Sequence, residues 1–502
     1  MENKQVSILQ TRRQFLRQAA CAAVGTAALT SAIRDLRFMN AAVAQSNIND
    51  YKALVCIFLA GGNDSNNLIV PTIQSEYDNY AAIRTPLLTL PLSGAPSNDL
   101  IQQIVSDNPD GHQYGFHPAC DKLVTLFNEK KLAVTFNTGT LVYPMTRSQY
   151  YSSLTKPPQL FSHADQVTQW QTSVPDKPAL TGWGGRCADL LATVQPNSPI
   201  SLSVTLSGAN TFEVGNIISQ YSVSTGGAIS LSGVSGARLN ALTNMLALPY
   251  PNMQAQAYSS VATHAINSGT LLNGAIGTTG STAWTPVFPG TITVPTGTGL
   301  VTFGSSLGPQ LKMIARLIEA GSRSVAQGGF GMKRQIFFCS VGGYDLHTGQ
   351  VGNSPTVGSH ANLLAELTQS MYAFQRAMEL IGTGAPAIPG RVADPDFAKR
   401  VTCFTSSDFG RTFPSNGQGT DHGWGSHHLI MGGAVNGKKT YGRFPTLAIK
   451  GPDDTDTGRW IPTTACDQYF ATLASWFGVD NSNLSTVFPN LGRFATPNLG
   501  FI

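Results

Sequence analysis

Three things that this 502-residue chain lacks narrow the functions open to it. It has no Cys-x-x-Cys pair, no haem-attachment sequence and no dinucleotide-type glycine pattern after an apolar run, so little favours a redox protein. It has no charge excess beyond residue 44, because the first 44 residues hold six of the 32 basic and two of the 28 acidic residues, which leaves 26 of each. No nucleic-acid partner is therefore expected. Its N-terminal apolar run is about half of the roughly 20 residues that cross a bilayer, so no stable membrane span is expected.

The first 44 residues are typical of a twin-arginine export signal. Residues 11–17 (TRRQFLR) precede an uncharged, alanine-rich stretch over 18–32, and residues 42–44 (AVA) have the small-x-small pattern that signal peptidase accepts. A cytosolic helix that begins at Thr11 is the alternative, but it does not account for this order of basic, apolar and small segments. We expect cleavage after Ala44 and a periplasmic or extracellular mature protein.

The six cysteines that follow residue 44 are predicted to be free thiols. Cys56, Cys339 and Cys403 lie within apolar runs, where a small buried thiol packs well. A twin-arginine substrate also folds before export, in a reducing compartment. A bridge among the other three cysteines stays open.

Apolar runs and helix-period segments alternate along the chain, which predicts an α/β fold. The β-branched and aromatic runs, typical of buried strands, are at residues 53–60, 132–136, 335–341 and 401–405. Helical periodicity occurs at residues 309–320, 361–381 and 467–477. We expect one domain over residues 45–502, with a mainly parallel sheet between helices and with ligands at the carboxyl ends of its strands.

Residues 201–304 differ from the rest of the chain. They are rich in Ser, Thr, Gly and Asn and nearly free of charge, and helical periodicity is weak apart from residues 237–248. We expect an insertion or cap over the sheet with β-rich or irregular structure. A surface segment without function is an alternative of equal weight.

Polar loops that contain Asp follow three of the four apolar runs. Residues 61–67 (GGNDSNN) contain Asp64, and their glycines allow a sharp turn, although the same residue types are common in ordinary turns. Residues 342–347 (GGYDLH) place Asp345 and His347 on one face of extended backbone. A carboxylate and an imidazole together suit a metal ion.

The third of these loops, residues 406–412 (SSDFGRT), follows the run at 401–405. In it, Arg411 either pairs with Asp408 or clamps an anionic group of a substrate. The densest polar segment is 420–428 (TDHGWGSHH), which holds three of the nine histidines among glycines that disfavour a core helix. We expect these loops to form a metal or anion site. The candidate metal ligands are Asp64, Asp345, His347, Asp408, Asp421 and His422, with His427 beside the ion or its ligands.

A hydroxyl near a divalent cation can attack phosphorus or sulfur. Ser162 is the preferred nucleophile, because His163 and Asp165 beside it add polar groups that a helix cap does not need. His163 is therefore a catalytic candidate together with Ser162. Thr146 and Ser148 are alternative nucleophiles, and each of these hydroxyls also fits a helix N-cap.

These motifs resemble those of the exported bacterial family called domain of unknown function 1501, which is similar to the alkaline phosphatase and sulfatase superfamily. The resemblance covers nearly the whole chain after residue 44. The matching segments are FLAGGNDSNNLIVP (58–71), FHPAC (116–120), LFSHADQVTQWQT (160–172), GWGGRCAD (182–189), GGYDLHTGQ (342–350), TSSDFGRTFPSNGQGTDHGWGSHH (405–428) and YGRFP (441–445).

The superfamily resemblance implies a parallel-sheet sandwich with one or two metal ions at the strand ends and a hydroxyl nucleophile. Two features depart from it: Phe409 stands where the loop usually supplies a histidine, and one residue separates Asp345 from His347 where the phosphatases have three. These departures leave open how a second ion would be held. By motif, the implied metal ligands are Asp64 on the first strand, Asp345 and His347 on a later strand, Asp408 in the sulfatase-like loop and His422.

Two hypotheses of function follow. The first is an exported hydrolase of phosphate or sulfate esters, on small molecules or polysaccharide, that depends on one or two divalent ions (Zn, Mn, Mg or Ca). In it Ser162 attacks and Arg411 steadies the charge on the transferred group. The second, motivated by Phe409 and the polar segment 201–304, is a catalytically inactive binding or surface-assembly protein on the same scaffold.

Overall fold

The computed structural model describes residues 48–502, apart from 85, 153–154, 196–197, 229–230, 232, 278–283, 285–286, 289, 298 and 388–389. The export signal expected at residues 1–44, with its cleavage site after Ala44, lies outside the described residues. No helix among the described residues is both long and apolar enough to cross a membrane.

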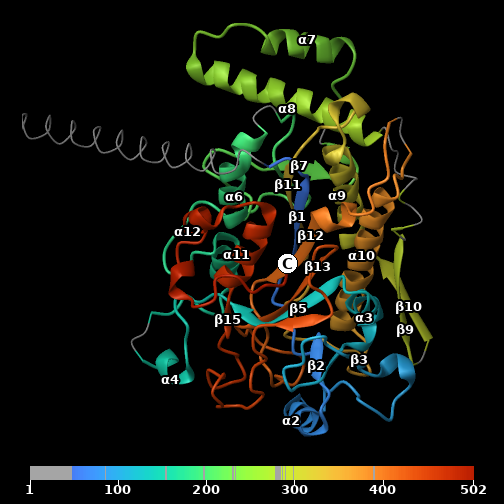
Figure 1. The fold of residues 1–502 in the computed structure, drawn as a ribbon, viewed down its shortest axis with the longest axis vertical. Helices are drawn as coiled ribbons and strands as arrows, with labels where there is room; N and C mark the ends of the chain where they lie inside the picture. Colours follow the sequence, from blue (N-terminus) through green and yellow to red (C-terminus); the bar gives the residue numbers. More distant parts are fainter. Residues whose placement is uncertain are drawn as a thin grey trace, which may run out of the picture.

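A ten-stranded sheet runs through the centre of the molecule (Figure 1). Its central strand β1 (Lys52–Leu59) pairs in parallel with β11 (Arg334–Val341) on one side and β12 (Val401–Ser407) on the other. From β11 the sheet continues through β6 (Ser203–Thr205), β7 (Tyr221–Ser224) and β8 (Gly227–Ala228). From β12 it continues through β13 (Ser426–Gly432), β5 (Leu132–Gly139) and β14 (Lys439–Tyr441), with β15 (Thr464–Ala465) also paired to β5.

The sheet is mixed but mostly parallel. The β12–β13, β13–β5 and β7–β8 pairs are antiparallel, and the other pairs are parallel. All four strands expected from apolar runs are present, as β1, β5, β11 and β12. The predicted α/β class with a mainly parallel sheet is confirmed.

Alternate side chains of β1 enter two different cores. Val55 and Ile57 pack in one core with α3 (Asp121–Asn128), α9 (Leu307–Ser322) and α10 (Ser359–Gly382). Cys56 and Phe58 pack in the other with α6 (Trp183–Leu191), α11 (Cys466–Phe477) and α12 (Leu484–Val487). Because successive side chains of a strand point to opposite faces, a strand buried in this way needs helices on both sides. Figure 1 shows these two helix layers on opposite sides of the sheet.

The segment over residues 201–304 first adds β6, β7 and β8 to the sheet and then leaves it. It forms α7 (Ala237–Leu246) and the 25-residue α8 (Met253–Gly277) at the top of Figure 1, and ends in the hairpin of β9 (Thr291–Thr296) and β10 (Gly299–Gly304). The expectation of β-rich or irregular structure is wrong for α8. Its buried residues lie mainly near its C-terminal end, whereas Met253 and Tyr258 near its start are 86 % and 74 % exposed, so the buried stripe is too short for periodicity to reveal.

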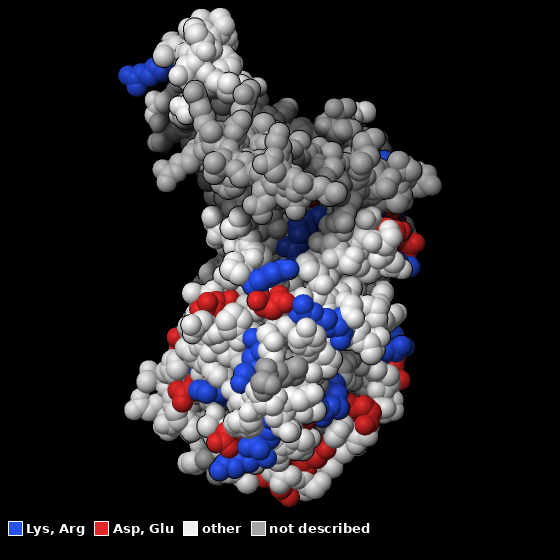
Figure 2. Space-filling model, turned by 90° about the vertical axis from the view of Figure 1, so that its left-hand side faces the viewer, with Lys and Arg blue, Asp and Glu red and all other residues white. Residues whose placement is uncertain are grey.

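Charged side chains are unevenly distributed over the molecule. On the face shown in Figure 2, basic and acidic residues are interspersed over the lower part. The helices α7 and α8 contain one arginine, Arg238, and no Lys, Asp or Glu. At the opposite end, β2 (Ile69–Pro71), β4 (Tyr114–Phe116) and β3 (Gln102–Ile104) form a small sheet near α2 (Gln74–Arg84). The six cysteines of the described chain are free and buried, as predicted.

Candidate metal centre

The carboxyl ends of three neighbouring strands meet at one edge of the sheet. Leu59 of β1 pairs with Val341 of β11 and with Ser407 of β12, so the loops that follow these residues leave the sheet together. These loops carry Asp345 after β11 and Asp408 after β12. Parallel strands place such loops where ligands bind in α/β proteins, and the candidate site forms here.

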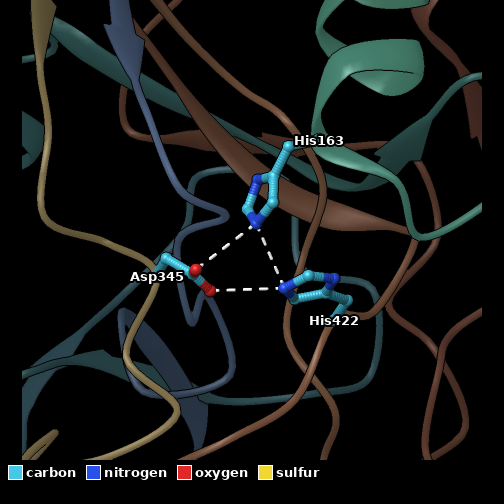
Figure 3. A group of neighbouring side chains, drawn as sticks. All are labelled: His163, Asp345 and His422. Atoms are coloured by element: carbon cyan, nitrogen blue, oxygen red, sulfur yellow. Dashed lines mark hydrogen bonds and ion pairs between the residues drawn. The ribbon is translucent and has the colours of Figure 1, made fainter.

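Three imidazoles and one carboxylate converge at this edge, and we call them the histidine–aspartate cluster. His422 Nε2 lies 3.1 Å from His163 Nε2 and 2.9 Å from His347 Nε2. Asp345 reaches all three rings: its Oδ2 is 3.4 Å from His163 Nε2, and its Oδ1 is 3.1 Å from His347 Nε2 and 3.3 Å from His422 Nε2. Figure 3 shows three of the four side chains pointing at one another from separate segments of the chain.

Each imidazole is held from behind by a hydrogen-bond acceptor. The contacts are Asp408 Oδ2 to His163 Nδ1 at 2.7 Å, Asp421 Oδ1 to His347 Nδ1 at 2.9 Å, and the Phe161 carbonyl oxygen to His422 Nδ1 at 2.7 Å. A carboxylate or carbonyl oxygen accepts, so these contacts assign the proton of each ring to Nδ1.

With a proton on each Nδ1, the Nε2 lone pair of His422 faces those of His163 and His347. Burial lowers the pKa of His422, and although the hydrogen bond to Phe161 opposes this effect, the charge of Arg411 adds to it, so the net shift is downward. Lone pairs about 3 Å apart repel unless a cation lies between them. An acceptor on Nδ1 behind an open Nε2 is also the usual arrangement of a metal-bound histidine. The geometry therefore fits a metal ion.

Arg411 holds Asp345 in its charged form. The guanidinium is buried, and its Nη1 donates to Asp345 Oδ1 at 2.7 Å. Burial raises the pKa of Asp345, but the hydrogen bond and charge of Arg411, helped by the nearby histidines, outweigh this effect and lower it overall. Arg411 also donates to the Gly61 carbonyl oxygen at 3.2 Å and to Thr420. Of the two alternatives for Arg411, the structure shows an ion pair, but the partner is Asp345 and not Asp408.

Two glycines bring the loop after β1 close to the cluster. Gly61 has a φ of +117°, and a Cβ there would lie 2.3 Å from the backbone nitrogen of Asp345. Gly62 has a φ of +84°, and a Cβ there would lie 2.5 Å from the ring of Phe409. Only glycine combines this backbone conformation with this close approach.

Phe409 forms an apolar wall of the cluster. Its ring centroid lies 4.8 Å from that of His163 and 4.7 Å from that of His422. The position where the superfamily resemblance expects a histidine is therefore filled by a ring that packs on two of the imidazoles and donates no ligand.

Asp64 stands apart from the cluster. It is buried, forms an ion pair with Arg84 and accepts from Gln350 Nε2 at 2.6 Å. Burial raises the pKa of Asp64, but the charge of Arg84 outweighs this effect and the net shift is downward. Gln350 Oε1 in turn accepts from Thr420 Oγ1 at 2.8 Å, and Thr420 contacts Arg411. Asp64 is thus tied to the cluster through a buried hydrogen-bond chain and not as one of its members.

The three hydroxyl candidates make local contacts. Ser162 precedes α5 (His163–Thr172), and its Oγ donates to Asp165 Oδ2 at 2.6 Å instead of capping the helix. Thr146 is the N-cap of α4 (Arg147–Tyr150) and forms a capping box with Gln149. Ser148 is exposed within that helix. The helix-cap alternative thus explains Thr146 but not Ser162.

His427 and His428 belong to the core and not to the cluster. They lie in β13, and burial lowers the pKa of each to about 3. His427 Nδ1 accepts from the backbone N–H of Asn137 at 3.0 Å. Both rings are therefore neutral and occupied by structural contacts.

The structure brings most of the predicted residues together but gives several of them another position. Asp345, His347 and His422, which were predicted as metal ligands, lie in the cluster, and His163, which was predicted as catalytic, supplies its third imidazole. Asp408 and Asp421, also predicted as ligands, instead hold imidazoles from behind. The residues that no sequence pattern indicated are Phe161, whose carbonyl fixes His422, and Asn416, whose Nδ2 donates to Asp421 at 3.0 Å.

The C-terminal part of this site matches a known family. Residues 396–471 fit the family model described as a protein of unknown function (DUF1501). The matched part runs from just before β12 into α11, so it contains Asp408, Arg411 and His422. This match supports the resemblance that the motifs indicate. No curated protein matches the chain.

Proposed function

We propose that the protein is a metal-dependent hydrolase of phosphate or sulfate esters. The observation that carries the proposal is the convergence of His163, His422 and the ionised Asp345, with His347 Nε2 beside the last two and an acceptor behind each ring. The cluster side chains are 23–45 % exposed, which leaves room for a substrate to approach.

The donor set favours some metal ions over others. Three nitrogen donors and one carboxylate fit Zn²⁺ or Mn²⁺ better than Mg²⁺ or Ca²⁺, which prefer oxygen ligands. Zinc with four protein ligands is typical of a structural site, whereas Mn²⁺, which accepts more ligands, would leave room for substrate and water. We therefore expect Mn²⁺ to support turnover better than Zn²⁺.

The residues around the cluster have separate roles in this proposal. A bound ion would polarise an oxygen of the ester and favour attack by a hydroxyl or water. Asp345 supplies a negative charge that Arg411 maintains, and Asp408 and Asp421 orient the rings. Ser162 is the proposed nucleophile: its oxygen would bond to the phosphorus or sulfur while the bond to the ester oxygen breaks, and Asp165, which accepts its hydrogen bond, can take up the proton and pass it to the departing alcohol. Water would then displace the group from Ser162 and restore the hydroxyl.

The arrangement of the sheet supports the finer fold assignment that we propose, an architecture of the alkaline phosphatase type. The support is the position of the cluster at the carboxyl ends of parallel strands, between two helix layers. Of the expected ligands, Asp408 and Asp421 lie behind imidazole rings, and Asp64 lies away from the cluster, paired with Arg84. We therefore propose a single ion.

Metal analysis and ester turnover test the proposal on purified protein. Protein loaded with Mn²⁺ should hydrolyse aryl phosphates or aryl sulfates and stop after chelation, and Asp345→Asn should lose both ion and turnover. Asp121→Asn is the matched control, because this carboxylate in α3 is 49 % exposed against 45 % for Asp345. Absence of a bound ion, or turnover that survives Asp345→Asn, would contradict the proposal.

One observation favours the binding or surface-assembly alternative. Four protein ligands complete the coordination of a zinc ion, and Phe409 closes one side of the cluster. A tightly bound Zn²⁺ whose removal lowers Tm, in a protein that hydrolyses no ester with any ion, would support this second function.

We also propose export by the twin-arginine route and function in the periplasm or outside the cell. The support is the order of segments in residues 1–44. Replacement of Arg12 and Arg13 by lysine should retain the precursor in the cytoplasm, and the exported wild-type protein should begin at Gln45. Equal export of both proteins would contradict this route.

A further inference from the structure

The guanidinium group of Arg459 is fixed beside the histidine–aspartate cluster. Its Nε donates to the backbone carbonyl oxygen of His422 at 2.8 Å, and its guanidinium carbon lies 4.2 Å from the centroid of the Phe161 ring. Phe161 is itself constrained, because its carbonyl accepts from His422 Nδ1 and its φ is +73°, which is uncommon for a residue other than glycine. Strained backbone of this kind is frequent at functional sites. The same two residues thus shape the cluster and position Arg459.

The remaining donors of Arg459 are available. Within the described part of the chain, its two terminal amino groups, Nη1 and Nη2, have neither a hydrogen-bond acceptor nor an ion-pair partner. Arg411 differs in this respect, because its side chain is buried and four of its five N–H groups donate to Asp345, Gly61 and Thr420. An anion could reach Arg411 only by displacing these contacts, whereas Arg459 has two free amino groups on one edge of a planar fork.

We propose that Arg459 binds an oxyanion of the substrate and that it, in place of Arg411, is the anion-recognising residue of the site. A guanidinium fork suits the paired oxygens of a phosphate or sulfate group. Because stacking on Phe161 and the bond to His422 already fix the side chain, little rotamer freedom is lost on binding. The substrate class is that of the proposed hydrolase, on which this assignment rests.

Inorganic phosphate is the probe, and isothermal titration calorimetry of the full mature protein loaded with Mn²⁺ is the measurement. Arg459→Ala should weaken phosphate binding about tenfold or more, since a hydrogen bond to a charged group is lost, and Arg459→Lys should recover part of the affinity. Metal content and Tm should stay at wild-type values in both variants.

Arg493→Ala is the matched control. Arg493 lies 4.6 Å from the ring centroid of Tyr143 and donates to the Val142 carbonyl oxygen at 3.2 Å, so its supports resemble those of Arg459. Its charge, however, is paired with Asp176 at 3.0 Å. Phosphate binding should not change in this variant.

The outcomes separate this inference from the proposed function. Unchanged phosphate affinity in Arg459→Ala overturns the inference. A lower metal content or a lower Tm in this variant also overturns it, because Arg459 would then only support His422. Phosphate binding that depends on Arg459 in a protein without ester turnover supports the inference and contradicts the hydrolase. Ester turnover with unchanged KM in Arg459→Ala contradicts the inference and leaves the hydrolase standing.

Discussion

Replacement of Asp408 by asparagine tests whether the carboxylates behind the rings orient metal ligands. Asp408 is buried, and its two oxygens accept from His163 Nδ1 at 2.7 Å and from the Gly61 N–H at 3.0 Å. An asparagine has one oxygen and one amino group, so it cannot accept from both donors. If the oxygen stays with Gly61, the amino group donates to His163 Nδ1 and the ring proton moves to Nε2. There it blocks the lone pair that faces the cluster.

The expected loss of metal affinity depends on how deeply the contact between the carboxylate and the ring is buried. Loss of a partner behind a metal-bound histidine typically weakens metal binding about 10- to 100-fold, or about 1.4–2.7 kcal/mol. Asp421 serves His347 in the same way, but its side chain is 47 % exposed against 4 % for Asp408, so water can replace its hydrogen bond. Asp421→Asn should therefore weaken metal binding less than Asp408→Asn, by less than about tenfold.

Competition with a chromophoric chelator for Zn²⁺ measures both affinities on the same scale. Circular dichroism and thermal unfolding of the chelated proteins establish that each variant is folded before its affinity is compared. Wild-type affinity in Asp408→Asn, or a greater loss in Asp421→Asn, would refute the view that Asp408 orients His163 as a ligand.

Three further changes test the buried surroundings. Burial raises the pKa of Asp467 to about 7, above the ordinary value of 3.8, so the folded state holds a proton that the unfolded state releases and stability falls as pH rises between these values. Asp467→Asn should therefore raise Tm at pH 8 and change it little at pH 4, and equal shifts at both pH values would argue against this cause. Arg84→Met leaves the buried carboxylate of Asp64 unpaired and should lower the free energy of unfolding by about 3–5 kcal/mol in chemical denaturation, whereas an unchanged value would show that the ion pair contributes nothing. Gly62→Ala sets a Cβ 2.5 Å from the Phe409 ring at a φ of +84° and should destabilise the protein by about 1–3 kcal/mol. Phe409→Ala should recover part of that loss, and a double variant no more stable than Gly62→Ala alone would exclude the clash.

The central strands and the place of the site were predictable for a physical reason. β1, β11 and β12 are buried on both faces, so each contains a run rich in apolar, β-branched and aromatic residues. Their parallel order brings the loops after them to one edge, which is why Asp345 and His347 could be predicted as neighbours of His422. The exposed helix α8 left no such pattern, because few of its side chains are buried.

The roles of His163, Asp408 and Asp421 could not be predicted from spacing. A carboxylate that contacts an ion and one that contacts the far side of an imidazole differ by the width of a ring, and only the folded loops determine which occurs. Asp64 shows the same limit, because its pairing with Arg84 depends on the position of α2, which no local pattern specifies.

The cluster also has a consequence for the lifetime of the folded chain. His163 and His422 are 259 positions apart in the sequence, and Asp345 lies between them. An ion bound to all of these side chains would cross-link three loops. Opening any one of these loops would then first require breaking a coordinate bond. The rate of unfolding, and with it the resistance of the protein to proteases, should then depend on the bound ion.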